Sequence, residues 1–250
     1  MIKRKILPKT FDLSNKRILI SGAAGSIGKE TAKLCSEFGA STILLDIKPV
    51  AHLEELRNKL SNVEAIHQCD ISNRILVEQI IKKNLPIDTL IDTAAICPFN
   101  DDWLDPEWNE NSFFRVIRTN LLGPINLVRA LLPEMINQKK GTITLCGSIA
   151  GWMGGLRAGP HYVASKGGIH SLVKWFSNKV TKYNIRVNAV APGPVDTDMI
   201  KNQQYDIDSY PLKRLGTAEE IANTLVFISS PAASFVVGNI LDVNGGIFKR

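Results

Sequence analysis

Long apolar runs are missing from the 250-residue sequence, and none approaches the roughly 18 residues that a membrane-spanning helix needs. The first five residues include a basic stretch, but Pro8, Lys9 and Asp12 interrupt any apolar segment that would complete a secretory signal. These absences predict a mature cytoplasmic protein without a membrane partner.

Patterns typical of metal and nucleic-acid binding are also missing. The four cysteines, at positions 35, 69, 97 and 146, form no Cys-x-x-Cys pair, and the four histidines are scattered. We expect free thiols in a reducing compartment and no metal site. The net charge is +6, but the basic residues are dispersed and no aromatic-studded basic stretch occurs. We therefore expect no nucleic-acid partner, while the positive charge suits an anionic ligand.

Short β-rich segments alternate with amphipathic stretches along the chain. Such alternation builds βαβ units, and several in succession build a parallel sheet. We predict one α/β domain over residues 1–250, doubly wound, with a seven-stranded parallel sheet and helices on both faces. The predicted strands are 17–21, 41–46, 63–68, 87–92, 142–146, 186–190 and 239–243, and the predicted helices are 27–38, 74–83, 113–137, 161–183 and 219–229.

Two segments fall outside this alternation. Residues 1–13 are predicted to be an N-terminal extension. Residues 192–213 contain three prolines and no clear periodicity. Long irregular segments in compact domains often cover a site, so we interpret residues 192–213 as a substrate flap.

A glycine-rich turn, Ser21-Gly22-Ala23-Ala24-Gly25-Ser26-Ile27-Gly28, follows the first predicted strand. Glycines at a strand-to-helix junction let the backbone approach a pyrophosphate, which binds at the positive end of the helix. A tight turn without a ligand would show the same glycines, but the predicted strand–turn–helix context favours a dinucleotide site.

Acidic residues follow the second and third predicted strands. Asp46 lies 18 residues past Gly28, close to the spacing at which a dinucleotide site places an acid on the adenosine ribose. A carboxylate there repels a 2′-phosphate, so NAD is favoured over NADP, while Lys48 would soften the repulsion. Asp70 is placed either to cap the adenine side of a cofactor or to cap the next helix.

A phenol and an ammonium group lie four residues apart in Tyr162-Val163-Ala164-Ser165-Lys166, on one face of a helix that Gly159-Pro160 should start. Lys166 and the helix N-terminus would place positive potential near the Tyr162 hydroxyl, which predicts a pKa lowered from about 10. Such a tyrosine exchanges a proton with an alcohol or ketone. Ser148, just past a predicted strand, would donate to a substrate oxygen or merely form a turn.

In this order, these motifs resemble the classical short-chain dehydrogenase/reductase family over residues 14–246. Further matching segments are Cys69-Asp70-Ile71, Thr119-Asn120-Leu121, 188–193 and 241–246. The resemblance implies a Rossmann fold and a catalytic tetrad. In that tetrad Tyr162 is the acid/base, Ser148 polarises the reacting oxygen, Lys166 lowers the Tyr162 pKa and binds the nicotinamide ribose, and Asn120 holds a water of a proton relay.

The resemblance also implies the cofactor contacts and the assembly. Besides Tyr162 and Lys166, the implied cofactor-binding residues are Gly22, Gly25, Ser26, Ile27, Gly28, Asp46, Asp70, Ile71, Ala94, Pro192, Val195 and Thr197. Family members commonly form homotetramers, so a homotetramer or homodimer paired through residues 113–137 and 161–183 is expected.

Three departures from the family pattern bear on the site. Ser26 replaces the middle glycine of the classical turn, which gives a glycine spacing similar to that of nucleotide-sugar epimerases and dehydratases. Asp92-Thr93-Ala94-Ala95 replaces the usual Asn-Asn-Ala-Gly, so altered hydrogen bonding is expected there. The stretch between Ser148 and Tyr162 is one residue longer than the commonest spacing, so its loop at 152–157 should affect specificity.

Candidate substrate contacts follow from position alone. They are Ser148, Trp152, Arg157, His161 and the flap. Arg157 and His161 suit an anionic group, while solvated surface and a helix start are the alternatives for them.

From these features we expect an NAD(H)-dependent oxidoreductase that transfers a hydride between nicotinamide and a secondary alcohol or ketone. One alternative is an NADPH-linked 3-oxoacyl-(acyl carrier protein) reductase. A nucleotide-sugar epimerase or dehydratase and a non-catalytic NAD-binding protein are the others.

Overall fold

Seven strands form one continuous parallel sheet in the structure, a computed structural model that describes residues 9–99, 103–155 and 157–250. Their order is β3-β2-β1-β4-β5-β6-β7, and every neighbouring pair is parallel. The strands are β1 (Arg17–Ser21), β2 (Ser41–Asp46), β3 (Val63–Gln68), β4 (Thr89–Asp92), β5 (Gly141–Cys146), β6 (Ile185–Pro192) and β7 (Ile240–Val243). The predicted α/β fold is confirmed. Residues 1–8 of the predicted extension and Leu156 of the predicted loop lie outside the described residues.

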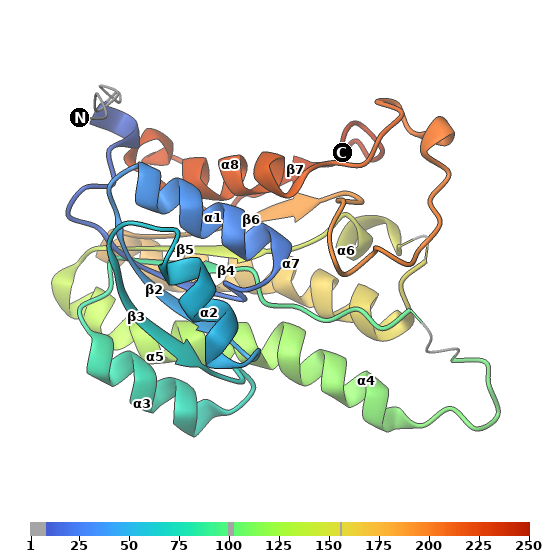
Figure 1. The fold of residues 1–250 in the computed structure, drawn as a ribbon, viewed down its shortest axis with the longest axis horizontal. Helices are drawn as coiled ribbons and strands as arrows, with labels where there is room; N and C mark the ends of the chain where they lie inside the picture. Colours follow the sequence, from blue (N-terminus) through green and yellow to red (C-terminus); the bar gives the residue numbers. More distant parts are fainter. Residues whose placement is uncertain (1–8, 100–102, 156) are drawn as a thin grey trace.

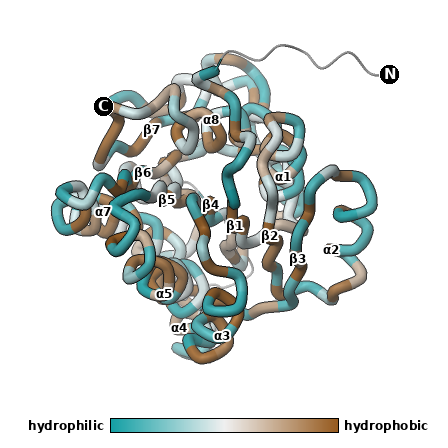
Figure 2. The backbone as a smooth tube through the Cα atoms, turned by 90° about the vertical axis from the view of Figure 1, so that its left-hand side faces the viewer, coloured by the Kyte–Doolittle hydropathy of each residue, from teal (hydrophilic) through white to brown (hydrophobic). Residues whose placement is uncertain are grey.

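Helices cover both faces of this sheet (Figure 1). The first face carries α1 (Ser26–Glu37) and α8 (Ala218–Ser229), with α2 (Val50–Arg57) near β3. The opposite face carries α3 (Arg74–Asn84), α5 (Gly123–Gln138) and α7 (Pro160–Val180). Figure 2 shows the three layers end on, with α8 and α1 above the sheet and α3 and α5 below it. The central strands are apolar and buried because both of their faces pack against helices.

The prediction of one long helix over 113–137 is wrong, because three consecutive helical segments occupy this region. The structure has α4 (Glu110–Ile117), a π-helical turn η2 (Arg118–Leu122) and then α5. A π turn holds one residue more than an α turn and is frequent at functional sites. This wide turn carries the buried Asn120.

Two helices were not predicted from the sequence. They are α2, which follows Pro49, and the short α6 (Ala150–Met153) directly after Ser148. Helix α7 begins at Pro160 with Gly159 as its N-cap, as the Gly-Pro pair predicted. The short 3-10 turns are η1 (Lys9–Phe11), η3 (Thr181–Tyr183), η4 (Ile207–Ser209) and η5 (Pro231–Ala233). No helix among the described residues is long and apolar enough to cross a membrane.

The segment predicted as a flap forms a loop whose two ends meet. The Asp196 amide donates to the Gly216 carbonyl at 2.9 Å, and the Gly216 amide donates to the Pro194 carbonyl at 3.0 Å. Directly afterwards, Thr217 and Glu220 cap the start of α8 with reciprocal side-chain hydrogen bonds. Strand β6 extends to Pro192, so the irregular part starts one residue later than predicted.

Candidate active site

A cleft of about 820 Å³ opens at the carboxyl ends of the strands. Ligands bind at this edge of an open α/β sheet, where neighbouring connections turn to opposite faces. Here β1 lies between β2 and β4, and Ser21 is in register with both Leu45 and Asp92. Of the predicted site residues, the cleft is lined by Gly22, Gly25, Ser26, Ile27, Gly28, Asp46, Asp70, Ile71, Ala94, Ser148, Arg157, Tyr162, Lys166, Pro192, Val195 and Thr197.

The glycine-rich turn packs too closely for side chains at two positions. Gly22 has a φ of +68°, and a Cβ on it would lie 2.7 Å from the Ala94 nitrogen. A Cβ on Gly28 would lie 2.1 Å from the Gly22 carbonyl oxygen. Gly25 is the N-cap of α1 and supplies no side-chain acceptor to the first turn of that helix. The amides of this turn therefore suit an anionic group such as a pyrophosphate.

Ser26 connects the glycine-rich turn to the flap. Its Oγ accepts a hydrogen bond from the Asp198 amide at 3.3 Å. A glycine at this position has no side chain with which to form the bond. The departure from the family pattern therefore adds a contact between two walls of the cleft.

The Asp46 carboxylate is buried and lies at the β2 end of the cleft. Its Oδ2 accepts a hydrogen bond from the Ala24 amide at 2.8 Å, and its Oδ1 accepts one from the Lys48 amide at 2.9 Å. The Lys48 ammonium donates to the Ala24 carbonyl at 3.1 Å. Carboxylate oxygens accept more than one hydrogen bond, so the position fits ribose hydroxyls.

Asp70 lines the same end of the cleft. Two roles were predicted for it, contact with the adenine side of a cofactor and capping of the next helix, and the structure tests the second. Its Oδ1 accepts a hydrogen bond from the Ser72 amide at 2.9 Å. The cap of α3 is Asn73, whose side chain accepts from the Leu76 amide. Asp70 is therefore not the helix cap.

Tyr162, Lys166 and Ser148 come together at the centre of the cleft. The Lys166 Nζ lies 5.6 Å from the centroid of the Tyr162 ring and donates to the Cys146 carbonyl at 2.7 Å. Ser148 follows β5, and its Oγ accepts from the Ala150 amide at 3.1 Å. A side-chain hydrogen bond also links Ser148 with Tyr162. The phenol is therefore placed beside one hydroxyl and near one ammonium group.

Burial raises the pKa of Tyr162 above its usual range. The neighbouring thiols of Cys97 and Cys146 raise this pKa further, while the hydrogen bond with Ser148 lowers it. The sequence predicted a lowered pKa, and the structure gives the opposite direction. The spacing between Tyr162 and Lys166 predicted a nearby ammonium group, which lowers the pKa of a phenol. It could not predict the desolvation of the phenol, which raises that pKa.

Asn120 is buried behind the cleft wall rather than exposed in it. Its Oδ1 accepts from the Ile96 amide at 2.8 Å, and its Nδ2 donates to the Ile96 carbonyl at 2.8 Å and to Ser165 Oγ at 3.2 Å. Asn120 therefore connects the segment after β4 with helix α7 through hydrogen bonds. The water relay implied by the family resemblance stays a prediction.

Asp92 stands where the family usually has asparagine, and its hydrogen bonds join the ends of two strands. The Ser21 hydroxyl and the Ala94 amide donate to its Oδ1. Burial raises the pKa of Asp92, while the charge of Lys166 lowers it. Thr93 Oγ1 donates to the Ser21 carbonyl at 2.7 Å. Asp92 and Ser21 support the turn without lining the cleft, whereas Thr93 and Ala94 line it.

Trp152, predicted as a substrate contact, does not line the cleft. Its ring stacks on His170 with the ring centroids 4.1 Å apart, and its Nε1 donates to Asp242 at 3.2 Å. The guanidinium of Arg250 lies 4.5 Å from the ring centroid. The short helix α6 turns Trp152 away, and Met153 faces the cleft instead.

His161 also lies outside the cleft, contrary to its prediction as a substrate contact. Its imidazole is buried, and Nδ1 accepts a hydrogen bond from the Tyr162 amide at 2.7 Å. It is a residue of the helix start, which was the alternative interpretation. It orients the first turn of α7 rather than a substrate.

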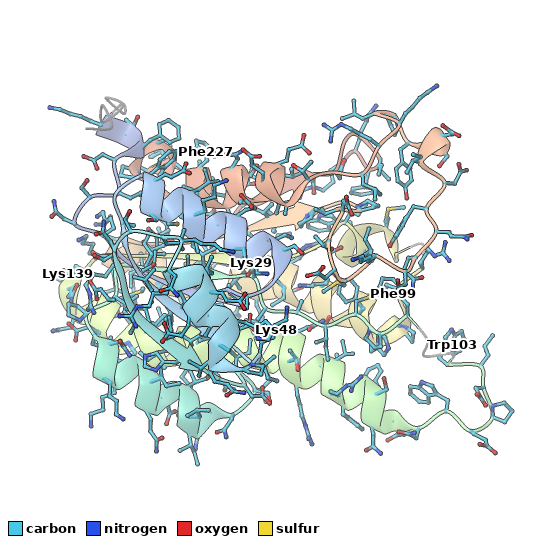
Figure 3. The ribbon with its side chains drawn as sticks, in the orientation of Figure 1. Lys29, Lys48, Phe99, Trp103, Lys139 and Phe227 are labelled. Carbon is cyan, nitrogen blue, oxygen red and sulfur yellow. The ribbon has the colours of Figure 1, made fainter. Side chains whose placement is uncertain are left out.

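Arg157 does line the cleft, together with residues that the sequence did not single out. Its guanidinium donates to the Gln204 carbonyl of the flap and lies 5.7 Å from the centroid of the Tyr205 ring. Figure 3 places Phe99 toward the flap, apart from Lys48 at the β2 end. The further lining residues that were not predicted include Cys97, Pro98, Phe99, Arg115 and Thr119, whereas Met153 belongs to the predicted loop and Met199 and Tyr205 belong to the predicted flap. The signal for Arg115 was its place one helical turn before Thr119, next to Asn120.

Comparison with known proteins gives the family. A profile described as Enoyl-(Acyl carrier protein) reductase matches residues 22–248. The 3-oxoacyl-(acyl carrier protein) reductase of Thermotoga maritima is 32% identical over 250 aligned residues, which cover 94% of this chain and 98% of the relative. This chain belongs to the short-chain dehydrogenase/reductase family.

Solved structures of the short-chain dehydrogenase/reductase family agree with the fold and with a nicotinamide cofactor. A Brucella melitensis 3-oxoacyl-(acyl carrier protein) reductase with bound NAD has a TM-score of 0.85 and 31% identity, covering 98% of this chain and 97% of that one. An Agrobacterium tumefaciens protein with bound NADP, described as a candidate 2-deoxy-d-gluconate 3-dehydrogenase, has a TM-score of 0.86 and 26% identity, covering 96% and 98%. The chain is an oxidoreductase that uses a nicotinamide cofactor.

The cleft of this short-chain dehydrogenase/reductase fits such a cofactor. Gly25 and Ser26 would hold the pyrophosphate, Asp46 and Asp70 the adenosine, and Lys166 the nicotinamide ribose. Within the described ranges 9–99, 103–155 and 157–250, no group of three or more His, Cys, Asp or Glu side chains could hold a metal ion.

Proposed function

We propose that the protein transfers a hydride between NAD(H) and the carbon of a secondary alcohol or ketone, with Tyr162 as the acid/base. The observation that carries the proposal is the position of the half-buried Tyr162 side chain, which lines the cleft beside Ser148 and near the Lys166 ammonium. A hydroxyl pair of this kind holds one substrate oxygen between them.

Each side chain then has one task. The bound nicotinamide supplies the hydride donor or acceptor. Tyr162 gives a proton to the reacting oxygen during reduction and removes it during oxidation, while Ser148 donates a hydrogen bond to that oxygen. Because burial raises the pKa of Tyr162, the phenol carries its proton in the free protein and is ready to donate it. The charge of Lys166 stabilises the tyrosinate that remains.

We infer a preference for NAD over NADP from the end of β2. Asp46 places a carboxylate at the ribose position, and a 2′-phosphate would meet its negative charge. The Lys48 ammonium, which would offset that charge, is bonded to the Ala24 carbonyl.

For partners, we infer a small alcohol or ketone and a second copy of the chain in the cytoplasm, with no nucleic acid and no membrane. Support for a homodimer or homotetramer comes from apolar side chains that lie exposed on α4, η2 and α7. They are Phe114, Leu122 and Trp175, which are 47%, 42% and 55% exposed.

The catalytic proposal is tested with Tyr162→Phe. We expect kcat/KM for secondary alcohols with NAD⁺ to fall by about 100- to 10,000-fold, because the variant cannot transfer the proton. The affinity for NADH, measured by fluorescence, should stay within about threefold of the wild-type value, which corresponds to less than 1 kcal/mol. Tyr183→Phe, in η3 and away from the cleft, is the matched control. Full activity of Tyr162→Phe would refute the proposal.

The cofactor proposal is tested by comparing kcat/KM for NADH and NADPH on the same ketone. We expect NADH to be preferred, and we expect Asp46→Ser to shift the ratio toward NADPH by about tenfold because it removes the carboxylate. Asp46→Ser also removes the hydrogen bond from the Ala24 amide. Because that loss affects both cofactors, the NADH-to-NADPH ratio of kcat/KM isolates the effect of the carboxylate on the 2′-phosphate.

A second candidate function is reduction of 3-oxoacyl groups on an acyl carrier protein. It is favoured by the descriptions of the relatives and by the net charge of +6, which suits an acidic carrier. Faster turnover of an acetoacetyl thioester with NADPH than of any simple ketone with NADH would support it over the first proposal.

A further inference from the structure

We propose that Arg115 and Arg157 form an anion-recognition pair, so that the substrate carries a carboxylate or phosphate as well as the reacting alcohol or ketone. The inference rests on the proposed function, because it assigns a chemical class to the substrate of the same site. Both arginines line the cleft, and they come from distant parts of the chain, α4 and the loop between α6 and α7.

Charge is distributed unevenly along the cleft. The β2 end carries Asp46 and Asp70 with Lys48 between them. The opposite end carries Arg115 and Arg157, and we call it the substrate end. The third acidic residue in the described lining is Asp198, whose backbone amide donates a hydrogen bond to Ser26 in the glycine-rich turn. The two guanidinium charges are thus not balanced by a matching pair of carboxylates.

Neither arginine has an ion-pair partner among the residues that the structure describes. By contrast, Arg17, Arg129, Arg214 and Arg250 each lie within 4 Å of a carboxylate. Arginines that line a cavity without a carboxylate are suited to a ligand that supplies one.

The walls around the pair are mainly apolar. Pro98, Phe99, Met153 and Ile200 line the same cavity as the two arginines. Arg115 and Arg157 are themselves exposed, so their guanidinium groups are accessible to a ligand, and a planar carboxylate or a phosphate pairs with guanidinium through two parallel hydrogen bonds. An anionic substrate would provide this pairing.

Arg157 is already oriented by the flap and keeps donors for a ligand. It donates to the Gln204 carbonyl and lies over the Tyr205 ring. Burial raises the pKa of Tyr205 and of Tyr210, and the charge of Arg157 opposes that rise. A guanidinium has five N–H donors, so one bond to the flap leaves the others free. The flap therefore holds Arg157 in position without neutralising it.

The test compares charged and neutral substrates of the same shape. The probes are lactate, 3-hydroxybutyrate and 4-hydroxypentanoate, each with its methyl ester, and glycerol 3-phosphate with glycerol. The measured quantity is the acid-to-neutral ratio of kcat/KM with NAD⁺ in the wild type, Arg115→Met, Arg157→Met, Arg157→Lys and Arg118→Met. Arg118 is the matched control, since it is exposed one residue past the end of α4 and does not line the cleft.

We expect the wild type to prefer the anion in at least one pair. Arg115→Met and Arg157→Met should each lower the ratio by about tenfold or more, since each removes a charge-assisted hydrogen bond. Arg157→Lys should lower it less, and Arg118→Met should leave it unchanged. Preference for the hydroxy acids or for glycerol 3-phosphate identifies the anion as carboxylate or phosphate.

Three results would overturn the inference. The first is a wild type that prefers the neutral substrate of every pair. The second is an acid-to-neutral ratio of kcat/KM that changes no more in Arg115→Met and Arg157→Met than in Arg118→Met. The third is an equal loss of kcat/KM for the acid and for its neutral counterpart in Arg157→Met. The last result would mean that Arg157 only holds the flap.

A binding measurement separates this inference from the proposed function. Calorimetric titration of the best hydroxy acid into Tyr162→Phe protein saturated with NADH reports anion binding without turnover. About tenfold weaker binding on adding Arg115→Met supports the pair even if Tyr162 proves not to be the acid/base. Unchanged binding refutes the pair while leaving the role of Tyr162 intact.

Discussion

At the scale of single residues, His170 combines deep burial with missing partners. Its side chain is 2% exposed, and neither ring nitrogen has a hydrogen-bond partner among the described residues. A Cβ on Gly147 or Gly151 would come within 2.7 Å of the imidazole, so the ring packs directly behind the loop that carries Ser148. Burial lowers the pKa of His170 to about 4, as do the charges of Lys166, Arg250 and Lys174, while Asp242 raises it.

This lowered pKa makes stability depend on pH. Between about pH 6.5 and pH 4 the unfolded chain binds a proton at His170 and the folded protein does not, so the free energy of unfolding falls as the pH falls. We expect a loss on the order of 2–3 kcal/mol from this residue across that range. Urea unfolding at several pH values measures it, and His170→Leu should show a correspondingly weaker dependence. An identical slope in both proteins would contradict the assignment.

Single residues also mark what the sequence could and could not predict about the site. Spacing and order were enough to select Tyr162, Lys166 and Ser148, which the structure brings together. They did not reveal the direction of the Tyr162 pKa, because burial depends on segments distant in the chain, including those that carry Cys97 and Cys146. Arg115 was missed because its one sequence signal, a place one helical turn before Thr119, is also met by many arginines on helix surfaces.

At the scale of elements, the strands were the most predictable part. The first three have the bounds expected from the sequence. In the first two, continuous apolar runs end at a polar residue, whereas the third mixes polar and apolar residues between turn segments. The helices around the site were less predictable. Periodicity continues across 113–137, and nothing in it distinguishes a π turn at Arg118–Leu122 from an α turn.

The short helix α6 explains why Trp152 lies outside the cleft. A helix of four residues is too short for periodicity to fix its orientation, so the sequence could not show which of Trp152 and Met153 faces the cleft. The structure turns Trp152 toward His170 and Arg250. Loop 152–157 therefore contributes Met153, Gly155 and Arg157 to the substrate end.

At the scale of the whole molecule, the exposed apolar side chains on α4, η2 and α7 predict self-association. We expect sedimentation velocity to give the mass of a dimer or tetramer. Phe114→Asp should shift the distribution toward smaller species, because it places a charge in the apolar contact. Ile75→Asp is the matched control, since Ile75 is an exposed apolar residue on α3. A monomeric wild type would contradict the prediction.

The closed ends of the flap have a consequence for how the molecule can change. Asp196, Gly216 and Pro194 fasten the two ends of the loop to each other, and α8 has its own capping box. Lengthening a loop with fixed ends costs little free energy, because closure entropy grows only with the logarithm of its length. Residues 197–215 can thus be exchanged or extended as a cassette while Tyr162 and Lys166 keep their places on α7. Exchanging this loop should therefore change the substrate specificity while the sheet stays as it is.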